Sequence, residues 1–161
     1  AHITSVEDLC YVLDHGVNVQ DFTLTVPLTV GWAKTSFGQM CCDGESDIIC
    51  AFLNRTQTDV EEVCCFYGMR AVHIAAYKGY KDIMCILVED HKAVINTRNE
   101  GGGTPLMEAV FSGHIDIVKY LVEHGADIND RNNNGISVIY WARYHGHQDI
   151  VQYLENQGAI I

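Results

Sequence analysis

A repeat of about 33 residues runs through the sequence and becomes visible when the last third of the chain is laid on the part before it. A unit of this size holds two short helices and a turn, which cannot bury an apolar face alone, so copies must stack. At a shift of 33 residues the coinciding pairs are Gly135 and Gly102, Ser137 and Thr104, Ala142 and Ala109, Gly146 and Gly113, His147 and His114, Asp149 and Asp116, Ile150 and Ile117, Val151 and Val118, Leu154 and Leu121, Gly158 and Gly125, and Ala159 and Ala126. At a further shift of 34 residues, the same positions are taken by Gly68, His73, Ala75, Ala76, Gly79, Asp82, Ile83 and Leu87. A weaker copy before it has Gly44, Asp47, Ile48, Ile49 and Phe52.

The most complete copy, residues 99–129, predicts two short helices. Thr104 suits the N-cap of the first helix, and Pro105 suits its first position, where a missing N–H costs nothing. That helix is expected to stop near Gly113. The second helix should end at Gly125, since glycine tolerates the left-handed conformation that follows a helix. Its apolar residues recur at helical spacing and are Ile117, Val118, Leu121 and Val122.

These motifs resemble the ankyrin repeat, whose hallmark is a Gly-x-Thr-Pro-Leu-His-x-Ala-Ala string followed by Gly-His and by a Gly-Ala-Asp-Val-Asn end. The resemblance implies an all-α repeat, an ankyrin-type solenoid of helix-turn-helix units joined by β-hairpin-like turns. It is carried by Gly102–Asn129, Gly135–Ala159 and Gly68–Asn96. We therefore expect a single array over residues 1–161, with divergent N-terminal units in 1–65 and clear repeats in 66–97, 98–130 and 131–161.

The sequence also departs from this pattern in three places. One residue is inserted between Leu87 and Asn96, and the segment from Asn18 to Gly44 is degraded, although residues 35–41 are compatible with a divergent first helix. Residues 52–65 form a longer, acidic connection. Because the chain opens without Met and in the middle of a unit, we expect it to be a stretch of a longer protein.

Composition excludes several classes of function. The formal charge of −11 disfavours nucleic-acid binding, which needs basic residues to displace counterions from phosphate. No apolar run approaches the roughly 20 residues that span a bilayer. Seven cysteines, an odd number without C-x-x-C spacing, fit neither a disulfide framework nor a zinc finger. We therefore expect reduced cysteines in a cytoplasmic or nuclear protein that does not insert into membranes.

Residues that suggest catalysis have simpler interpretations. His73, His114, His147, His15 and His124 fall at repeat positions where the ankyrin resemblance implies structural histidines. Asp47, Asp82, Asp116 and Asp149 recur in the first turn of each second helix, where negative charge complements the helix dipole. Gly101–Gly103 lacks the Lys-Ser/Thr of a phosphate loop. We predict no catalytic residues, no metal site and no cofactor.

The remaining functional feature is a surface. In the resembled fold, partners contact the turn tips and the exposed positions of each first helix, which line a concave face. Aromatic and Arg residues, which are enriched at interface hot spots, are frequent at the corresponding positions. The predicted partner-binding residues are Trp32, Phe66, Tyr67, Met69, Tyr77, Lys78, Arg98, Glu100, Phe111, Ser112, Arg131, Asn133, Asn134, Ile136, Tyr144 and His145.

The sequence therefore predicts a non-enzymatic protein–protein interaction module, a scaffold or adaptor, whose partner is a basic or mixed-charge protein. By itself the module is expected to be monomeric. Three alternatives stay open. The array is a targeting or regulatory segment of a larger enzyme, receptor or channel; the irregular N-terminal region is a cysteine-dependent enzyme, with Cys41, Cys42, Cys64 or Cys65 as nucleophile and His73 as base; or the concave face binds a small molecule.

Overall fold

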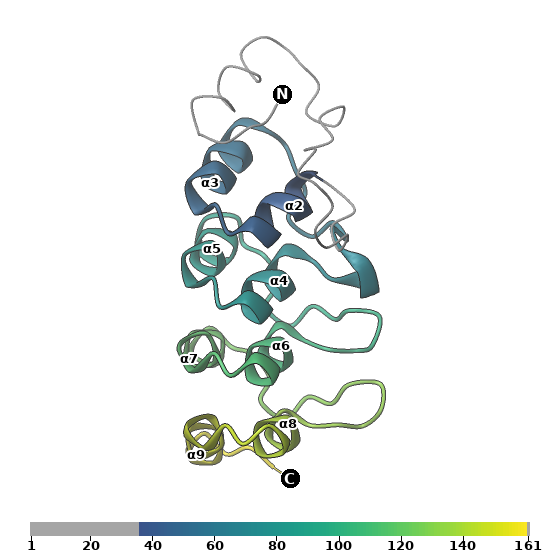
Figure 1. Ribbon diagram of the computed structural model, residues 1–161, viewed down its shortest axis with the longest axis vertical. Helices are drawn as coiled ribbons and strands as arrows, with labels where there is room; N and C mark the ends of the chain where they lie inside the picture. The colour runs from purple at the N-terminus through teal and green to yellow at the C-terminus, as the bar shows by residue number, and fades with distance from the viewer. Residues whose placement is uncertain (1–35, 161) are drawn as a thin grey trace.

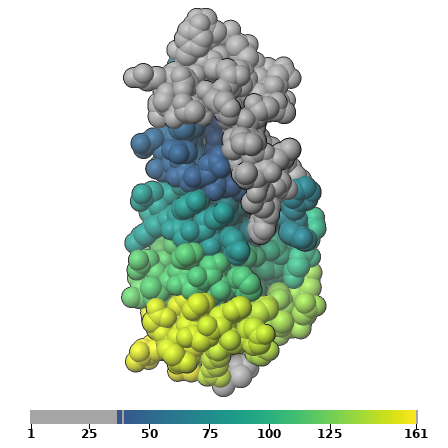
Figure 2. All heavy atoms as spheres, viewed as in Figure 1, coloured from purple at the N-terminus to yellow at the C-terminus, as the bar shows by residue number. Residues whose placement is uncertain are grey.

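Four helix pairs stack along one axis in the computed structural model, which describes residues 36–160. The pairs are α2 (Ser36–Asp43) with α3 (Ser46–Arg55), α4 (Ala71–Lys78) with α5 (Lys81–Cys85), α6 (Pro105–Ser112) with α7 (Ile115–Glu123), and α8 (Val138–Tyr144) with α9 (Gln148–Asn156). The first helices α2, α4, α6 and α8 form one column, called the inner column here, and the second helices form the outer column (Figure 1). Seen as space-filling atoms, the pairs are successive bands of one body (Figure 2).

The helix boundaries follow the predicted local signals. The Thr104 hydroxyl accepts the Met107 N–H at 3.4 Å at the start of α6, and Pro105 is its first residue. Gly113 ends α6 in the left-handed conformation, at φ 80°. Each second helix carries an acidic residue in its first turn, at Asp47, Asp82, Asp116 and Asp149, where it faces the positive end of the helix dipole.

The core lies between the two columns and runs continuously through the stack. Every pair contributes to its largest fully buried side chains, as expected of units that cover one another. They are Phe37, Ile49, Ile83, Met84, Leu87, Leu106, Ile117, Leu121, Ile139, Ile150 and Leu154. The expected divergent first helix is present as α2, with Phe37 and Phe52 stacked at 6.1 Å between ring centroids.

Hairpin-like turns project from the inner column and bond to one another. Within them, the Asn99 N–H donates to the Gly103 carbonyl and the Asn132 N–H donates to the Ile136 carbonyl. Between them, the Glu100 N–H donates to the Tyr67 carbonyl at 2.9 Å, and the Asn133 N–H donates to the Gly101 carbonyl at 3.0 Å. In residues 36–160 these turns contain no regular strand, and Arg131 and Ser137 form an isolated antiparallel bridge. The short Phe66–Gly68 turn, a single turn of 3₁₀-helix, occupies the same place in the second unit.

The inserted residue of the second unit is absorbed inside a helix. After α5 the chain continues as one stretch of π-helix, Ile86–Asp90, which is the usual way for a helix to hold one extra residue. In the third unit the Ala126 N–H reaches back five residues to the Leu121 carbonyl; in the second, the Ala93 N–H reaches back six, to Leu87. The insertion therefore ends before the next turn, and the following units keep their phase.

This insertion also places a lysine where the other units have glycine. Lys92 has φ 57°, a left-handed conformation that costs a residue with a Cβ about 1 kcal/mol, whereas Gly125 holds the corresponding position in the next unit at φ 92°. We expect Lys92→Gly to raise the free energy of unfolding by about 0.5–1 kcal/mol, as measured by urea denaturation. The matched change Lys119→Gly, in the middle of α7, should lower it by about 1 kcal/mol. A loss of stability in Lys92→Gly would contradict this account of the turn.

Candidate partner-binding surface

Successive units are joined by one recurring contact. The residue before α5, α7 and α9 lies over the glycine that ends the first helix of the preceding unit; these residues are Tyr80, His114 and His147. A Cβ on Gly79 would come within 2.7 Å of the His114 ring, and a Cβ on Gly113 within 2.7 Å of the His147 ring. Glycine is therefore required twice at these positions, for the left-handed turn and for the close approach.

The same side chains bond back to the carbonyls of the inner column. The His114 Nε2–H donates to the Tyr77 carbonyl at 3.1 Å, and the His147 Nε2–H donates to the Phe111 carbonyl at 3.4 Å. At the first junction the Tyr80 hydroxyl reaches the Cys42 carbonyl at 3.5 Å. Each bond fixes the backbone of a residue at the end of a first helix. The column of side chains at these ends is thus set by the junctions between units.

Aromatic rings fill this column and contact one another from unit to unit. Tyr77 of α4 stacks on Phe111 of α6 with ring centroids 6.3 Å apart, and Phe111 meets the edge of Trp141 of α8 at 5.7 Å. His145 packs against both Phe111, at 4.6 Å, and Trp141, at 5.6 Å. Tyr144 completes the group through contacts to Trp141 and His145. We refer to Tyr77, Phe111, Trp141, Tyr144 and His145 as the aromatic row.

The aromatic row is reachable from solvent although its members support one another. Tyr144 is 69% exposed and Phe111 41% exposed, while Tyr77 and Trp141 are half-buried against the core. Phe66 and Tyr67, in the turn that precedes α4, are 47% and 70% exposed. Tyr67 holds φ 62°, which is rare for a residue with a side chain, and local strain of this kind is concentrated at functional sites.

Most of the predicted binding residues lie on the surface, and one does not. The exposed members are Phe66, Tyr67, Lys78, Arg98, Glu100, Phe111, Arg131, Asn133, Asn134, Tyr144 and His145, and the half-buried ones are Tyr77, Ser112 and Ile136. Met69 was expected to be exposed and is buried, at 7%. Its carbonyl accepts the N–H groups of both Cys64 and Cys65, which turns the chain so that its side chain enters the core. Trp32 lies outside the described residues.

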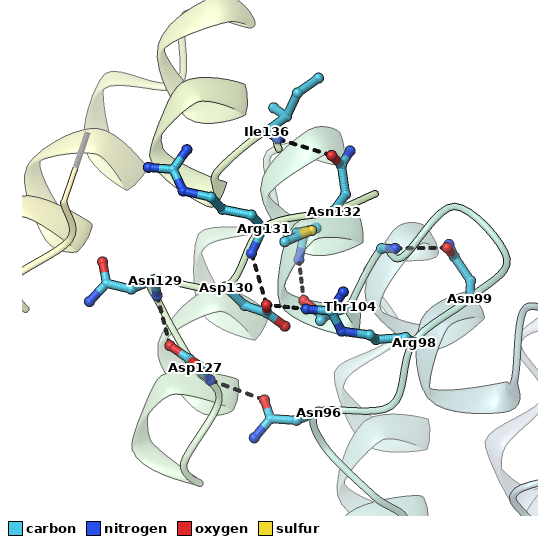
Figure 3. A network of polar contacts seen from close by, with 12 residues as sticks. Asn96, Arg98, Asn99, Thr104, Asp127, Asn129, Asp130, Arg131, Asn132 and Ile136 are labelled. Atoms are coloured by element: carbon cyan, nitrogen blue, oxygen red, sulfur yellow. Dashed lines mark hydrogen bonds and ion pairs between the residues drawn. The ribbon is translucent and has the colours of Figure 1, made fainter. Parts of the chain in front are cut away.

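The polar residues of the turns mainly hold the turns together. Arg98 pairs with the Asp130 carboxylate, and the Arg131 N–H donates to that same carboxylate (Figure 3). The Asn133 amide donates to the Glu100 carbonyl at 3.0 Å. Asn96 bridges to the next turn by accepting the Asp127 N–H, and Asn99 and Asn132 close their own turns (Figure 3). These contacts make the turn tips a braced rim beside the aromatic row.

Two residues of this face were missed by the sequence analysis, Trp141 and Glu108. They occupy the same repeat position, three residues before Tyr144 and Phe111 respectively, and so lie on the same face of their helices. The prediction took only the last turn of each first helix. Extending it back by one helical step of three residues would have found both.

Glu108 is a half-buried carboxylate on this face. Burial is the main cause that raises its pKa to about 7, and the Asn99 amide, which donates to Oε1 at 2.9 Å, partly opposes that shift. His73 shows the opposite case. Burial lowers its pKa to about 4, and the bond that its Nε2–H donates to the Gly103 carbonyl partly opposes that shift. Its Nδ1 accepts the Arg70 N–H, as only an unprotonated nitrogen can.

Neither Cys41 nor Cys42 has the lowered pKa of a catalytic nucleophile. Burial raises the pKa of the Cys41 thiol, and a hydrogen bond to Cys65 together with burial raises that of Cys42, whereas nucleophilic catalysis needs a lowered pKa. Both ring nitrogens of His73 are already bonded to backbone groups. Among residues 36–160 there is also no group of three or more His, Cys, Asp or Glu side chains placed to hold a metal ion.

Comparison with known proteins identifies the family. The family model described as "Ankyrin repeats (3 copies)" matches residues 37–132 and 98–161, so the chain belongs to the ankyrin-repeat family. The all-helical stack of pairs in the described part of the chain agrees with this family's fold. None of the helices between residues 36 and 160 is both long enough and apolar enough to cross a membrane.

The individual relatives are much longer than this chain. Alpha-latrocrustotoxin-Lt1a of Latrodectus tredecimguttatus is 48% identical over 56 residues, which is 35% of this chain and 4% of the toxin. Alpha-latroinsectotoxin-Lt1a of the same spider is 47% identical over 55 residues, or 34% of this chain and 4% of the toxin. Serine/threonine-protein kinase 12 of Arabidopsis thaliana is 31% identical over 79 residues, which is 49% of this chain and 16% of the kinase.

The shifted pKa values of Glu108 and His73 predict opposing effects of pH on stability. The folded state holds an extra proton on Glu108 between about pH 4.5 and 7, so that stability is lost as pH rises through this range. It binds fewer protons at His73 between about pH 4 and 6.5, so that stability is lost as pH falls. In the wild type the two effects offset each other between pH 4.5 and 6.5.

We therefore expect Glu108→Gln to raise the free energy of unfolding at pH 8 by up to about 3 kcal/mol, since an uncharged amide replaces a half-buried carboxylate whose pKa is raised. The variant should also gain stability from pH 4.5 to 6.5, where the wild type changes little. Urea denaturation at pH 4.5, 6.5 and 8 measures both effects. Glu155→Gln, which removes an exposed carboxylate, is the control. Parallel pH curves for Glu108→Gln and the wild type would contradict the assignment.

Proposed function

We propose that this chain is a protein–protein interaction module that binds its partner along the aromatic row and the adjoining turn tips. The observation that carries the proposal is the row itself, in which rings from three successive units contact one another and remain exposed in part. Buried aromatic anchors supply most of the energy in protein interfaces. Membership in a family whose repeats are protein-binding modules supports the same conclusion.

Rigidity is the mechanism of binding. The carbonyl bonds at the junctions hold the backbone of Tyr77 and Phe111, and the rings are packed against their neighbours in the free protein. Little side-chain entropy is lost when a partner covers such a surface, so more of the contact energy appears as affinity. The braced turns position the polar rim in the same way.

Charge favours a partner with basic residues. The chain carries a formal charge of −11, which steers cationic proteins toward it. The faces of Trp141 and Tyr144 attract Arg and Lys side chains by cation–π interaction, and the Glu108 carboxylate lies on the same face of the inner column. A basic or mixed-charge segment therefore fits this surface better than an acidic one.

The chain acts in this proposal as a non-enzymatic adaptor or scaffold in the cytoplasm or nucleus. A second candidate is a targeting or regulatory segment of a larger protein. It is favoured because this chain matches only 4–16% of the length of its relatives. The two candidates share the binding surface. They differ in whether the partner lies in another chain or in the same one.

Replacing two neighbouring rings tests the surface. We expect the Tyr77→Ala/Phe111→Ala double variant to lose binding by at least about 30-fold, since even one hot-spot ring contributes about 2 kcal/mol or more and such contributions do not add fully. Pull-down from lysate under reducing conditions, followed by titration with the retained protein, measures the loss. Tyr153→Ala, which removes a half-buried ring from the outer helix α9, should bind like the wild type. Far-UV circular dichroism checks that all variants keep their helices.

A retained protein that binds the double variant as tightly as the wild type would show that the aromatic row is not the binding site. A partner lost equally from Tyr153→Ala would show that general destabilisation, and not the row, explains the effect.

A further inference from the structure

Two pairs of adjacent cysteines meet at the first junction of the stack. Cys41 and Cys42 lie in α2, and Cys64 and Cys65 lie just before the Phe66–Gly68 turn. The Cys42 and Cys65 sulfur atoms are 3.7 Å apart although the residues are 23 positions apart in the chain. This thiol pair belongs to none of the contacts used in the proposed function.

The backbone around both thiols is held by bonds that do not use the sulfur atoms. The Cys42 carbonyl accepts the Tyr80 hydroxyl, and the Cys65 N–H donates to the Met69 carbonyl at 3.2 Å. A disulfide bond is about 2.05 Å long, so the two sulfur atoms must approach by only about 1.7 Å. Rotation of a cysteine side chain about its Cα–Cβ bond moves the sulfur atom by distances of this size.

The other thiols near this site are directed elsewhere. The Cys64 thiol points to the Met69 carbonyl, at 3.7 Å, and Cys41 is fully buried. Cys50 lies one helix away on α3, where it accepts a hydrogen bond from the Asn54 amide. In the described part of the chain, the 3.7 Å contact of Cys42 and Cys65 is therefore the one arrangement suited to closing a bond.

We propose that Cys42 and Cys65 are a dithiol site that closes to a disulfide by exchange with a low-molecular-weight disulfide of the glutathione type. Cys42 is the half-exposed member, so its thiolate attacks one sulfur of the small disulfide, forms a mixed disulfide and releases one small thiolate. The buried Cys65 thiolate then attacks the Cys42 sulfur and releases the second. The two small thiolates take the two protons that the cysteines lose, so two protein thiols are oxidised and one small disulfide is reduced to two thiols.

The rate and the consequence of closure follow from the surroundings. The hydrogen bond to Cys65 and burial raise the pKa of Cys42, so the thiolate is scarce near neutral pH and exchange is faster at higher pH. The bond would join α2 to the residue directly before the exposed Phe66 and Tyr67. Its effect on partner binding rests on the proposed function, whereas its formation does not.

Counting thiols in the whole chain tests the proposal. The reduced protein is equilibrated with glutathione disulfide at pH 8, the remaining thiols are alkylated, and the products are weighed and fragmented by mass spectrometry. Without alkylation the oxidised wild type should weigh about two mass units less than the reduced protein, and with alkylation it should take up two fewer alkyl groups. An added glutathione would raise the mass instead. Fragmentation should place the bond between Cys42 and Cys65.

Serine variants distinguish this pair from its neighbours. Cys42→Ser and Cys65→Ser should each form no crosslink, whereas the adjacent controls Cys41→Ser and Cys64→Ser should form it as the wild type does. Cys42→Ser changes a half-exposed residue and keeps the test valid if Cys65→Ser fails to fold. A wild type that keeps every thiol, a crosslink that persists in Cys42→Ser, or a bond to any other cysteine would overturn the proposal. Loss of partner binding in the Tyr77→Ala/Phe111→Ala variant would leave these thiol counts unchanged.

Discussion

The structure depends on a single contact that is made once at each junction, where an aromatic or imidazole ring covers a glycine and bonds to a carbonyl of the preceding unit. His114 and His147 make it with a ring N–H, and Tyr80 with a hydroxyl. The contact needs glycine on one side because a Cβ would collide with the ring. It orients one unit on the next and fixes the carbonyl at the end of each first helix. The spacing of the aromatic row is a consequence of this repetition.

The aromatic row and the core beneath it therefore have different roles. The core is filled by aliphatic side chains that any ankyrin-type stack must bury, and it explains stability without explaining function. The aromatic row is not needed for stacking, since Phe111 and Tyr144 leave much of their surface in water. The partial burial of the Glu108 carboxylate likewise lowers stability without being needed for the helix. Features that are costly for stability and gathered on one face are expected of a binding site.

Much of the fold could be predicted from the residues, because capping and stacking are read directly from short motifs. Thr104, Pro105 and Gly113 mark α6 at the predicted places, and His73, His114, His147 and His124 bond to backbone carbonyls as structural histidines do. The absorption of the inserted residue by a π-helical stretch could not be predicted, because a turn could hold the same extra residue.

The candidate site was less predictable than the fold, because exposure depends on how neighbouring units cover one another. Met69 has the sequence neighbours of a turn residue, yet hydrogen bonds to its carbonyl turn its side chain inward. Trp141 and Glu108 were missed because only the residues in the last turn of each first helix were assigned to the binding surface. The proximity of Cys42 to Cys65 has no sequence signal at all, since it arises from the return of the chain after α3.

Tyr80 holds the repeat position that histidine holds in the next two units, and this difference affects the order in which the units of the array unfold. In a linear stack, cooperativity is limited by the weakest coupling between neighbours, and opening starts there. The Tyr80 bond, at 3.5 Å, is longer than the two histidine bonds and lies between the α2–α3 pair and the rest. We therefore expect opening to begin at this junction, which would separate the α2–α3 pair from the three units that carry the aromatic row. A covalent link between Cys42 and Cys65 would cross this same boundary and couple the pair to its neighbour.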